Sequence, residues 1–137
     1  MAFTANEQFD SADQGSFPGV APETVAPREV GAIGAAPLLK VLTPMHRSTV
    51  DGKWYPWSHT AGAGGANVIA GFLYPDKCQT DASHSVLAVM LLEGKVDYNG
   101  ILAAIPTGEV EADLKADLKL IAVRNAGLYV TNLAGVA

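Results

Sequence analysis

The stretch Ser85-Val-Leu-Ala-Val-Met-Leu-Leu-Glu-Gly-Lys-Val-Asp-Tyr98 is the most regular part of the chain, and it decides the expected fold. Its first half, Ser85–Leu92, is rich in β-branched and other apolar residues, which predicts a central strand. Glu93-Gly94 then predicts a turn. In Lys95–Tyr98, charged and apolar residues alternate, which is typical of a half-exposed strand. The stretch therefore predicts antiparallel β-structure at the centre of the protein.

Shorter apolar runs on both sides of this stretch predict further strands. Asp51-Gly52 and Asn99-Gly100 are typical of hairpin turns, and Pro56 restricts its run to the edge of a sheet or to an irregular strand. The expected strands cover residues 38–42, 53–57, 68–74, 101–105 and 128–133.

One long helix is expected near the C-terminus, from about Gly108 to Asn125. Thr107 is a candidate N-cap, because its hydroxyl can accept a hydrogen bond from an early backbone N–H. The apolar residues that would share one face are Val110, Leu114, Leu118, Ile121 and Ala122. We therefore expect the α+β class: a mostly antiparallel β body with one long helix in its C-terminal region, long loops and an extended N-terminal arm.

The first 36 residues differ in composition from the rest of the chain, and we call them the arm. They contain five acidic residues, one Arg and no Lys, and three prolines favour an extended conformation. The apolar side chains of the arm occur singly, with no sustained helical or strand period: Phe3, Phe9, Phe17, Val20, Val25, Val30 and Ile33. Such a segment cannot bury enough apolar surface to fold alone. We expect an arm over residues 1–36 and a folded body over residues 37–137.

Charge and cysteine content narrow the classes of function. The chain of 137 residues has a net charge of −5. Its body shows no basic patch, which argues against direct binding of nucleic acid. The single Cys78 excludes an intrachain disulfide and a cysteine-based metal cage. Because no signal-peptide pattern and no membrane-length apolar run is present, we expect a protein made in a cytoplasm and without a membrane partner.

The residues that could carry a phosphate or metal site show weak patterns. Gly62–Gly65 is not followed by the Lys-Ser/Thr pair that a phosphate-binding loop needs, so we expect a flexible or close-packed loop there. His46, His59 and His84 lack the close spacing of zinc ligands, and surface or loop histidines are the favoured interpretation. A zinc site assembled by long-range folding is the alternative.

The candidate catalytic residues are equally weak. A Cys78–His84 nucleophilic pair is one hypothesis, but a lone cysteine is more often a small buried residue. Asp113 and Asp117 share a face of the expected helix, and such a face is most often solvated. We assign no catalytic residue, no metal ligand and no cofactor.

Trp54, Tyr55 and Trp57 form the densest aromatic group of the sequence. Large aromatic residues dominate both cores and protein interfaces, so a core or subunit-interface position is the default. We expect one of the two tryptophans to lie at an interface.

These residues belong to a pattern that resembles a known family. Four segments follow one another in the sequence: Ala36-Pro37-Leu38-Leu39, the run 52–57 with its Trp57, a Gly-rich loop and the expected strand Gly71-Phe72-Leu73. This order is similar to that of the head-decoration proteins of tailed phages, the phage lambda D type. Residues 89–98 resemble that family's segment of a strand, a Gly turn and a polar-aromatic strand. The resemblance runs from about residue 37 to the C-terminus, although the arm and the loops at 60–67 and 77–85 are longer here.

The resemblance implies a non-enzymatic structural virion protein on the outer surface of the expanded capsid, which it would stabilise against the pressure of packaged DNA. The implied partner is the major capsid protein, and the implied assembly is a homotrimer at the three-fold positions of the capsid. The arm would pair with the capsid by β-augmentation, and its single apolar residues would be the anchors. Another phage surface module, such as a fibre-attachment or adhesion domain, is the alternative, and an enzyme ranks third.

Overall fold

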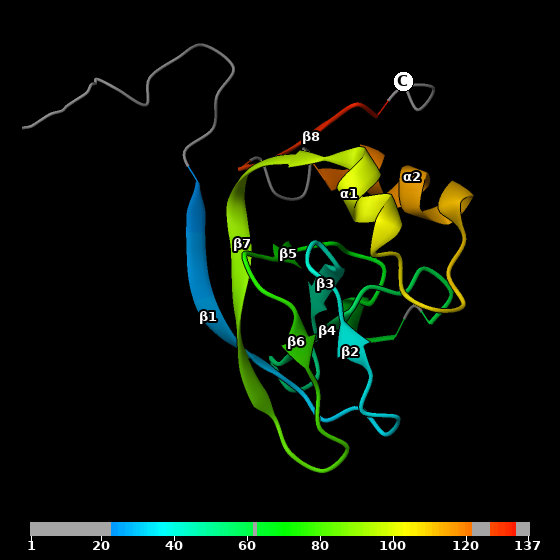
Figure 1. Ribbon diagram of the computed structural model, residues 1–137. Helices are drawn as coiled ribbons and strands as arrows, with labels where there is room; N and C mark the ends of the chain where they lie inside the picture. Colours follow the sequence, from blue (N-terminus) through cyan, green and yellow to red (C-terminus); the bar gives the residue numbers. More distant parts are fainter. Residues whose placement is uncertain (1–22, 62, 122–126, 134–137) are drawn as a thin grey trace, which may run out of the picture.

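A computed structural model describes residues 23–61, 63–121 and 127–133 of the chain (Figure 1). The strands are β1 (Thr24–Val30), β2 (Leu38–Leu39), β3 (Pro44–Arg47), β4 (Trp54–Pro56), β5 (Gly71–Leu73), β6 (Cys78–Gln79), β7 (Val86–Asp97) and β8 (Leu128–Thr131). The helices are the 3₁₀-helix η1 (Ala63–Gly65), α1 (Tyr98–Ala103) and α2 (Glu111–Lys119). None of the helices in these ranges is long and apolar enough to cross a membrane.

Five of the strands close into a barrel. Strand β1 pairs antiparallel with β7 and parallel with β4, β3 lies between β4 and β5, and β5 returns to β7. Strand β8 extends the sheet beyond the barrel and runs parallel to the last residues of β7, while β2 and β6 form a separate two-stranded sheet. The protein is mostly β, and the expected α+β body with one long helix is wrong.

The expected long helix is replaced by the nine-residue helix α2. Gly108 has a φ of +91°, a left-handed conformation that a right-handed helix cannot contain. The helix therefore begins at Glu111, with the extended Val110 as its N-cap in place of Thr107 and without a side-chain capping bond. Val110 is exposed as a result. The expected end of the helix, residues 122–125, lies outside the described ranges.

The expected strand, turn and second strand over residues 85–98 form one long strand, β7. Gly94 has a φ of +140°, and the register between β1 and β7 shifts at Thr24 and Val25, beside this glycine. A bulge of this kind bends a strand without reversing it. Beyond the bend β7 finds a new partner in β8, so the predicted turn at Glu93-Gly94 is wrong.

Helix α1 replaces the strand expected at residues 101–105. Tyr98 and Ile101 lie one helical turn apart and are both buried. A Cβ atom on Gly100 would lie only 2.6 Å from Cδ1 of Leu42, so this glycine allows close packing of the helix. A short apolar run fits a buried strand and a buried helix equally well, and here the packing around it decides for the helix.

Strand β1 belongs to the barrel, although the sequence places its residues in the arm. Each of its seven residues is paired with β7. Pro27 has no N–H to donate, which suits an edge strand; β4 pairs with β1 only at Val30. The folded body therefore includes Thr24, and the boundary expected between residues 36 and 37 is wrong. Residues 1–22 lie outside the described ranges.

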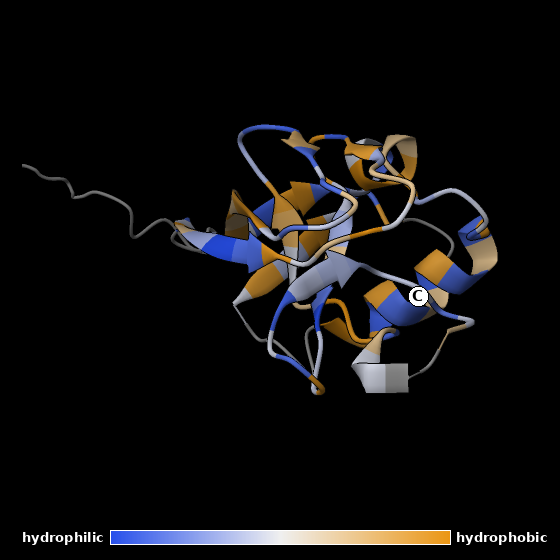
Figure 2. Ribbon diagram, turned by 90° about the horizontal axis from the view of Figure 1, so that it is seen from below, coloured by the Kyte–Doolittle hydropathy of each residue, from blue (hydrophilic) through white to orange (hydrophobic). Residues whose placement is uncertain are grey.

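Neighbouring residues of the barrel strands enter two different cores, because successive side chains of a strand point to opposite faces. Leu73 and Met90 enter the barrel interior, whereas Phe72 and Leu91 pack under the helices. The interior core contains Val30, Leu39, Met45, Trp54, Leu73, Cys78 and Met90. The second core contains Trp57, Ile69, Phe72, Leu91, Val96, Tyr98, Ile101, Leu114, Leu118, Ile121 and Leu128. In Figure 2, hydrophobic and hydrophilic segments accordingly alternate along the ribbon.

Candidate functional site

The arm residues that the sequence proposes as anchors fall into two groups. Phe3, Phe9, Phe17 and Val20 lie outside the described ranges. The other three anchors have different environments in the structure. Val25 is 44% exposed on β1, whereas Ile33 is half-buried and its N–H donates to the carbonyl of Asp81 at 3.0 Å. Val30 is completely buried inside the barrel. It is a core residue of its own chain, and its assignment as an anchor for a partner is wrong.

The junction between residues 1–22 and the barrel is held by side-chain and backbone contacts. The hydroxyl of Thr24 donates to a carboxylate oxygen of Glu93 at 2.8 Å. The backbone N–H of Gly94 donates to the carbonyl of Gly127 at 2.8 Å. A Cβ on Gly127 would lie 2.6 Å from Cγ of Glu93, so the glycine lets Glu93 fit between the starts of β1 and β8. The N-terminal segment is therefore joined to a well-fixed corner of the molecule.

An exposed apolar patch lies on the outer face of β1 and β7 next to this junction. Directly opposed residues of antiparallel strands share a face, and the register opposes Pro27 to Val89 and Glu29 to Leu87. Val25 lies on the same face of β1, two residues before Pro27. Leu87 is 77% exposed, Val25 and Pro27 are exposed, and Val89 is half-buried. We call Val25, Pro27, Leu87 and Val89 the outer patch.

The aromatic group lies in the cores rather than on the surface. Trp54 is 5% exposed in the barrel interior, and Trp57 is completely buried in the second core. Tyr55 is half-buried, lies against Gly31 and donates its hydroxyl to Asp51 at 2.6 Å. The core alternative is thus confirmed for both tryptophans, and the expectation that one of them lies at an interface is wrong.

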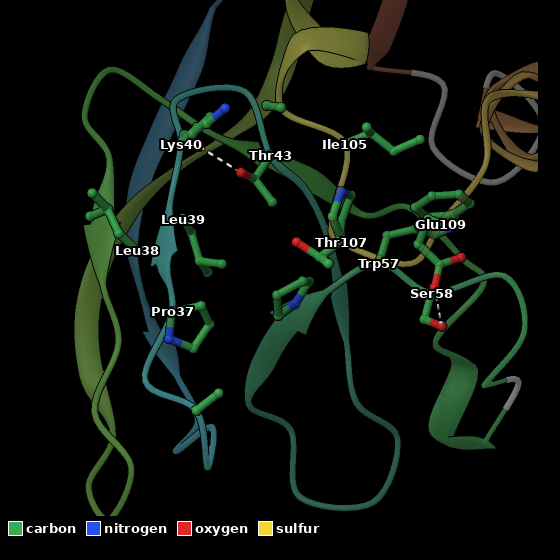
Figure 3. A pocket seen from close by; sticks show the side chains of 14 residues that line it. Pro37, Leu38, Leu39, Lys40, Thr43, Trp57, Ser58, Ile105, Thr107 and Glu109 are labelled. Atoms are coloured by element: carbon green, nitrogen blue, oxygen red, sulfur yellow. Dashed lines mark hydrogen bonds between the residues drawn. The ribbon is translucent and has the colours of Figure 1, made fainter.

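A groove of about 630 Å³ opens beside Trp57. Pro37, Leu38 and Leu39 form one wall, and Ile105 with Thr107 forms the opposite wall, as Figure 3 shows. Its other lining residues are Ala35, Lys40, Thr43, Pro56, Trp57, Ser58, Ala104, Pro106 and Glu109. Most of these side chains are apolar, so the groove offers a hydrophobic surface with polar groups at its ends.

A network of hydrogen bonds connects this groove to helix α2. One carboxylate oxygen of Asp117, Oδ2, accepts from the indole N–H of Trp57 at 2.8 Å and lies 2.9 Å from Nδ1 of His59. Glu109 accepts from the hydroxyl of Ser58 at 2.9 Å and from the backbone N–H of His59 at 3.0 Å. Three consecutive residues after β4 are thus fixed by two carboxylates. The network orients Trp57 and holds the end of the groove at which Ser58 lies.

Asp117 is the main residue that sequence reasoning missed. It is 5% exposed, so the solvated face expected for Asp113 and Asp117 is wrong for Asp117, whereas Asp113 is half-buried. A buried carboxylate needs hydrogen-bond donors, and Trp57 and His59 supply them from about 60 positions away. The only signal in the sequence was the position of Asp117 between Leu114 and Leu118, next to the apolar stripe of the helix.

The surroundings of His59 and His46 shift the pKa values of these two histidines in opposite directions. The hydrogen bond to Asp117 raises the pKa of His59 above its ordinary value of 6.5, and the negative charges of Asp113 and Glu109 add to the effect. Burial lowers the pKa of His46, although hydrogen bonds to the carbonyl groups of Pro56 and Tyr55 oppose the change. His46 is therefore suited to a neutral imidazole and His59 to a charged one.

The geometry does not support the hypothesis of a Cys78–His84 nucleophilic pair. Cys78 is buried in the barrel core, and burial raises the pKa of its thiol, which disfavours the reactive thiolate. His84 is 82% exposed and lies 3.5 Å from Asp81. Within the described ranges, no group of three or more His, Cys, Asp or Glu residues could hold a metal ion.

Residues 63–65 of the Gly-rich segment form a close-packed loop, as one of the two sequence alternatives proposes. Gly64 and Gly65 both have positive φ values, which glycine adopts without strain. The carbonyl of Gly64 accepts from the N–H of Thr49, and that of Ala66 accepts from the N–H of Ser58, both at 3.0 Å. Strand β5, and not a helix, follows the loop, so it lacks the helix N-terminus that phosphate sites use.

The chain was compared with known protein families, with curated proteins and with solved structures. None of the three comparisons finds a match.

Proposed function

We propose that this protein is a capsid decoration protein of a tailed phage. In this proposal it binds the outer surface of the expanded capsid and stabilises the shell against internal DNA pressure, without a catalytic role. Its proposed partner is the major capsid protein, and its proposed assembly is a homotrimer at the three-fold positions of the capsid. The order of motifs from Pro37 onward supports the proposal from the sequence side.

One structural observation carries the proposal: residues 1–22 lead directly into β1, a strand paired with β7 along its whole length. A load on the N-terminal segment would therefore act on a complete barrel wall, not on a loose loop. The bond between Thr24 and Glu93 reinforces the point of attachment. This is the mechanical property that a protein needs if it fastens a shell through its N-terminal segment.

The outer patch gives the proposed interface a second component. Val25 and Leu87 are exposed apolar side chains on the strands to which residues 1–22 are attached. Fixing the backbone of a residue on binding costs about 1–2 kcal/mol of conformational entropy. Contacts made by a rigid patch carry a smaller entropic cost, and three copies in a trimer would add avidity.

A truncation that respects the structure tests the proposal. Deletion of residues 2–22 leaves β1 intact, whereas a deletion reaching residue 30 would remove a barrel strand and unfold the body. We expect the 2–22 deletion to keep its melting temperature and trimer mass but to lose most of its binding to expanded capsids. Undiminished occupancy on capsids would contradict the arm's role, and a strict monomer at high concentration and on capsids would contradict the trimer.

The alternative, a fibre-attachment or adhesion module, differs in location. In that case the protein would be found on tails or fibres and not on the shell, and purified expanded capsids would bind neither the full chain nor the truncated one. Binding assays on capsids and on isolated tails, done with the same protein preparation, distinguish the two functions.

A further inference from the structure

The side chain of His59 lies beside carboxylate groups of α2 and of the segment just before this helix. Its Nδ1 lies 2.9 Å from Oδ2 of Asp117, and its Nε2 lies 3.8 Å from Oδ1 of Asp113, both on α2. Glu109, in the turn before α2, accepts from the backbone N–H of His59 at 3.0 Å. Among the residues that the structure describes, the charged groups that act on the imidazole are all acidic: Asp117, Asp113 and Glu109. A proton on His59 therefore offsets part of the negative charge of these three carboxylates.

Loss of that proton changes the contacts in a defined way. Because Asp117 is an acceptor, Nδ1 carries the hydrogen in both states, so the bond to Asp117 persists when the imidazole is neutral. The electrostatic attraction of the imidazole to Asp113, Asp117 and Glu109 is lost. The segment that contains His59 thereby loses an electrostatic attraction to α2, which favours a looser arrangement of the segment against the helix.

This segment is also part of the groove wall. Trp57 and Ser58, which precede His59, line the groove together with Glu109. Trp57 shares the acceptor atom Oδ2 of Asp117 with His59. A change at His59 thus reaches the groove through a shared carboxylate on one side and through Glu109 on the other.

We infer that protonation of His59 controls how firmly residues 57–61 are held against α2, and thereby the mobility of the groove wall at Trp57 and Ser58. The wall is firm when His59 is charged and looser when it is neutral. The direction follows from linkage: since the folded-state pKa lies above 6.5, the stabilising contribution is complete below pH 6.5. It is lost as the pH rises through the folded-state value. The inference does not depend on the proposed capsid function.

The direct test is NMR spectroscopy of the full chain, in which the imidazole of His59 and the indole N–H of Trp57 are followed from pH 5 to pH 9. We expect His59 to titrate above 6.5 and the Trp57 indole signal to shift with the same midpoint. The indole of Trp54, which lies in the other core, is the internal reference. A midpoint at or below 6.5, or a Trp57 signal that does not follow His59, would overturn the inference.

Hydrogen exchange measures the mobility itself. The backbone N–H of Ser58 donates to Ala66, and that of His59 donates to Glu109. The protection factors of both amides are corrected for the pH dependence of the intrinsic exchange rate. We expect protection to fall roughly two- to fivefold between pH 5.5 and pH 8.5, the size typical of a half-exposed charge pair. In His59→Gln the protection factors at pH 5.5 and pH 8.5 should agree. An equal pH-dependent fall in His59→Gln would show that His59 is not responsible.

Asp113→Asn provides a milder variant that keeps Asp117 and its two hydrogen bonds. It should lower the pKa of His59 and shift the protection change to lower pH, while the Trp57 indole still follows His59. If the midpoint stays unchanged in Asp113→Asn, the proposed role of the carboxylate cluster is wrong, even where His59→Gln proves too unstable to study.

Discussion

Trp57 donates its indole N–H to the carboxylate of Asp117 at 2.8 Å, although the two residues are 60 positions apart in the sequence. Both side chains are buried. The bond connects the segment after β4 to α2, and α2 covers the second core from the outside of the barrel. It therefore fixes the position of the helix relative to the barrel as well as the orientation of the indole.

Removal of the Asp117 carboxylate should reduce the free energy of unfolding more than removal of the Asp113 carboxylate. In Asp117→Ala the Trp57 indole and the His59 imidazole lose their acceptor, and an unsatisfied buried donor costs about 1–3 kcal/mol. Asp113→Ala is the matched control, because Asp113 lies one turn away, is partly exposed and is 3.8 Å from His59. Urea unfolding at pH 7 measures both. Equal losses in the two variants would contradict a structural role for the buried bond.

The contrast between Val30 and Val25 tests the revised boundary of the arm. Val30→Ala removes buried methyl groups from the barrel core and should destabilise the protein by about 1–3 kcal/mol. Val25→Ala changes an exposed side chain and should leave the stability within about 0.5 kcal/mol of the wild type. Under the proposed function, only Val25→Ala should weaken capsid binding at unchanged stability. If Val30→Ala melts like the wild type, β1 is not a structural strand.

Two glycines differ sharply in what a methyl group would meet. A Cβ on Gly71 would lie 2.9 Å from the backbone carbonyl oxygen of Leu91, whereas a Cβ on Gly34 would meet nothing within 4 Å. Gly71→Ala should force β5 and β7 apart at a cost of about 1–3 kcal/mol, and Gly34→Ala should be close to neutral. Thermal unfolding of both variants measures the difference, which should vanish if β5 and β7 do not pair.

The buried His46 should make the protein sensitive to acid. Its folded-state pKa lies below 6.5 because of burial, so the unfolded chain takes up the proton first and stability falls as the pH drops below 6.5. His46→Gln should lose stability less steeply than the wild type between pH 7.5 and pH 5. His84→Gln, at an exposed position, is the matched substitution. Parallel pH curves for the wild type and His46→Gln would contradict this origin of acid sensitivity.

The sequence predicts much of the β-structure, because its strands alternate or are bounded by turn residues. The hairpin at Asp51-Gly52 is confirmed, since β3 and β4 pair across it, and the last expected strand contains β8. The sequence favours a core or a subunit-interface position for Trp54 and Trp57, and the structure places both in the core. These features depend on local residue patterns, which single-sequence reasoning detects well.

The errors concern features that long-range partners decide. Residues 24–30 have no strand period of their own and become a strand because β7 pairs with all of them. Gly94 is typical of a turn, but here it bends β7, whose last residues continue as a strand and pair with β8. The expected helix does not start near Gly108 but only at Glu111, because Gly108 adopts a positive φ. Asp117 has the pattern of a surface residue and is buried by Trp57 and His59.

The most direct test of the central claim is a cryo-microscopy reconstruction of expanded phage capsids saturated with this protein. The proposal predicts trimeric density at the three-fold positions, with the barrel outside the shell and residues 1–22 continuing from β1 onto the major capsid protein. Bare capsids, or barrel density whose N-terminal segment makes no contact with the shell, would contradict it.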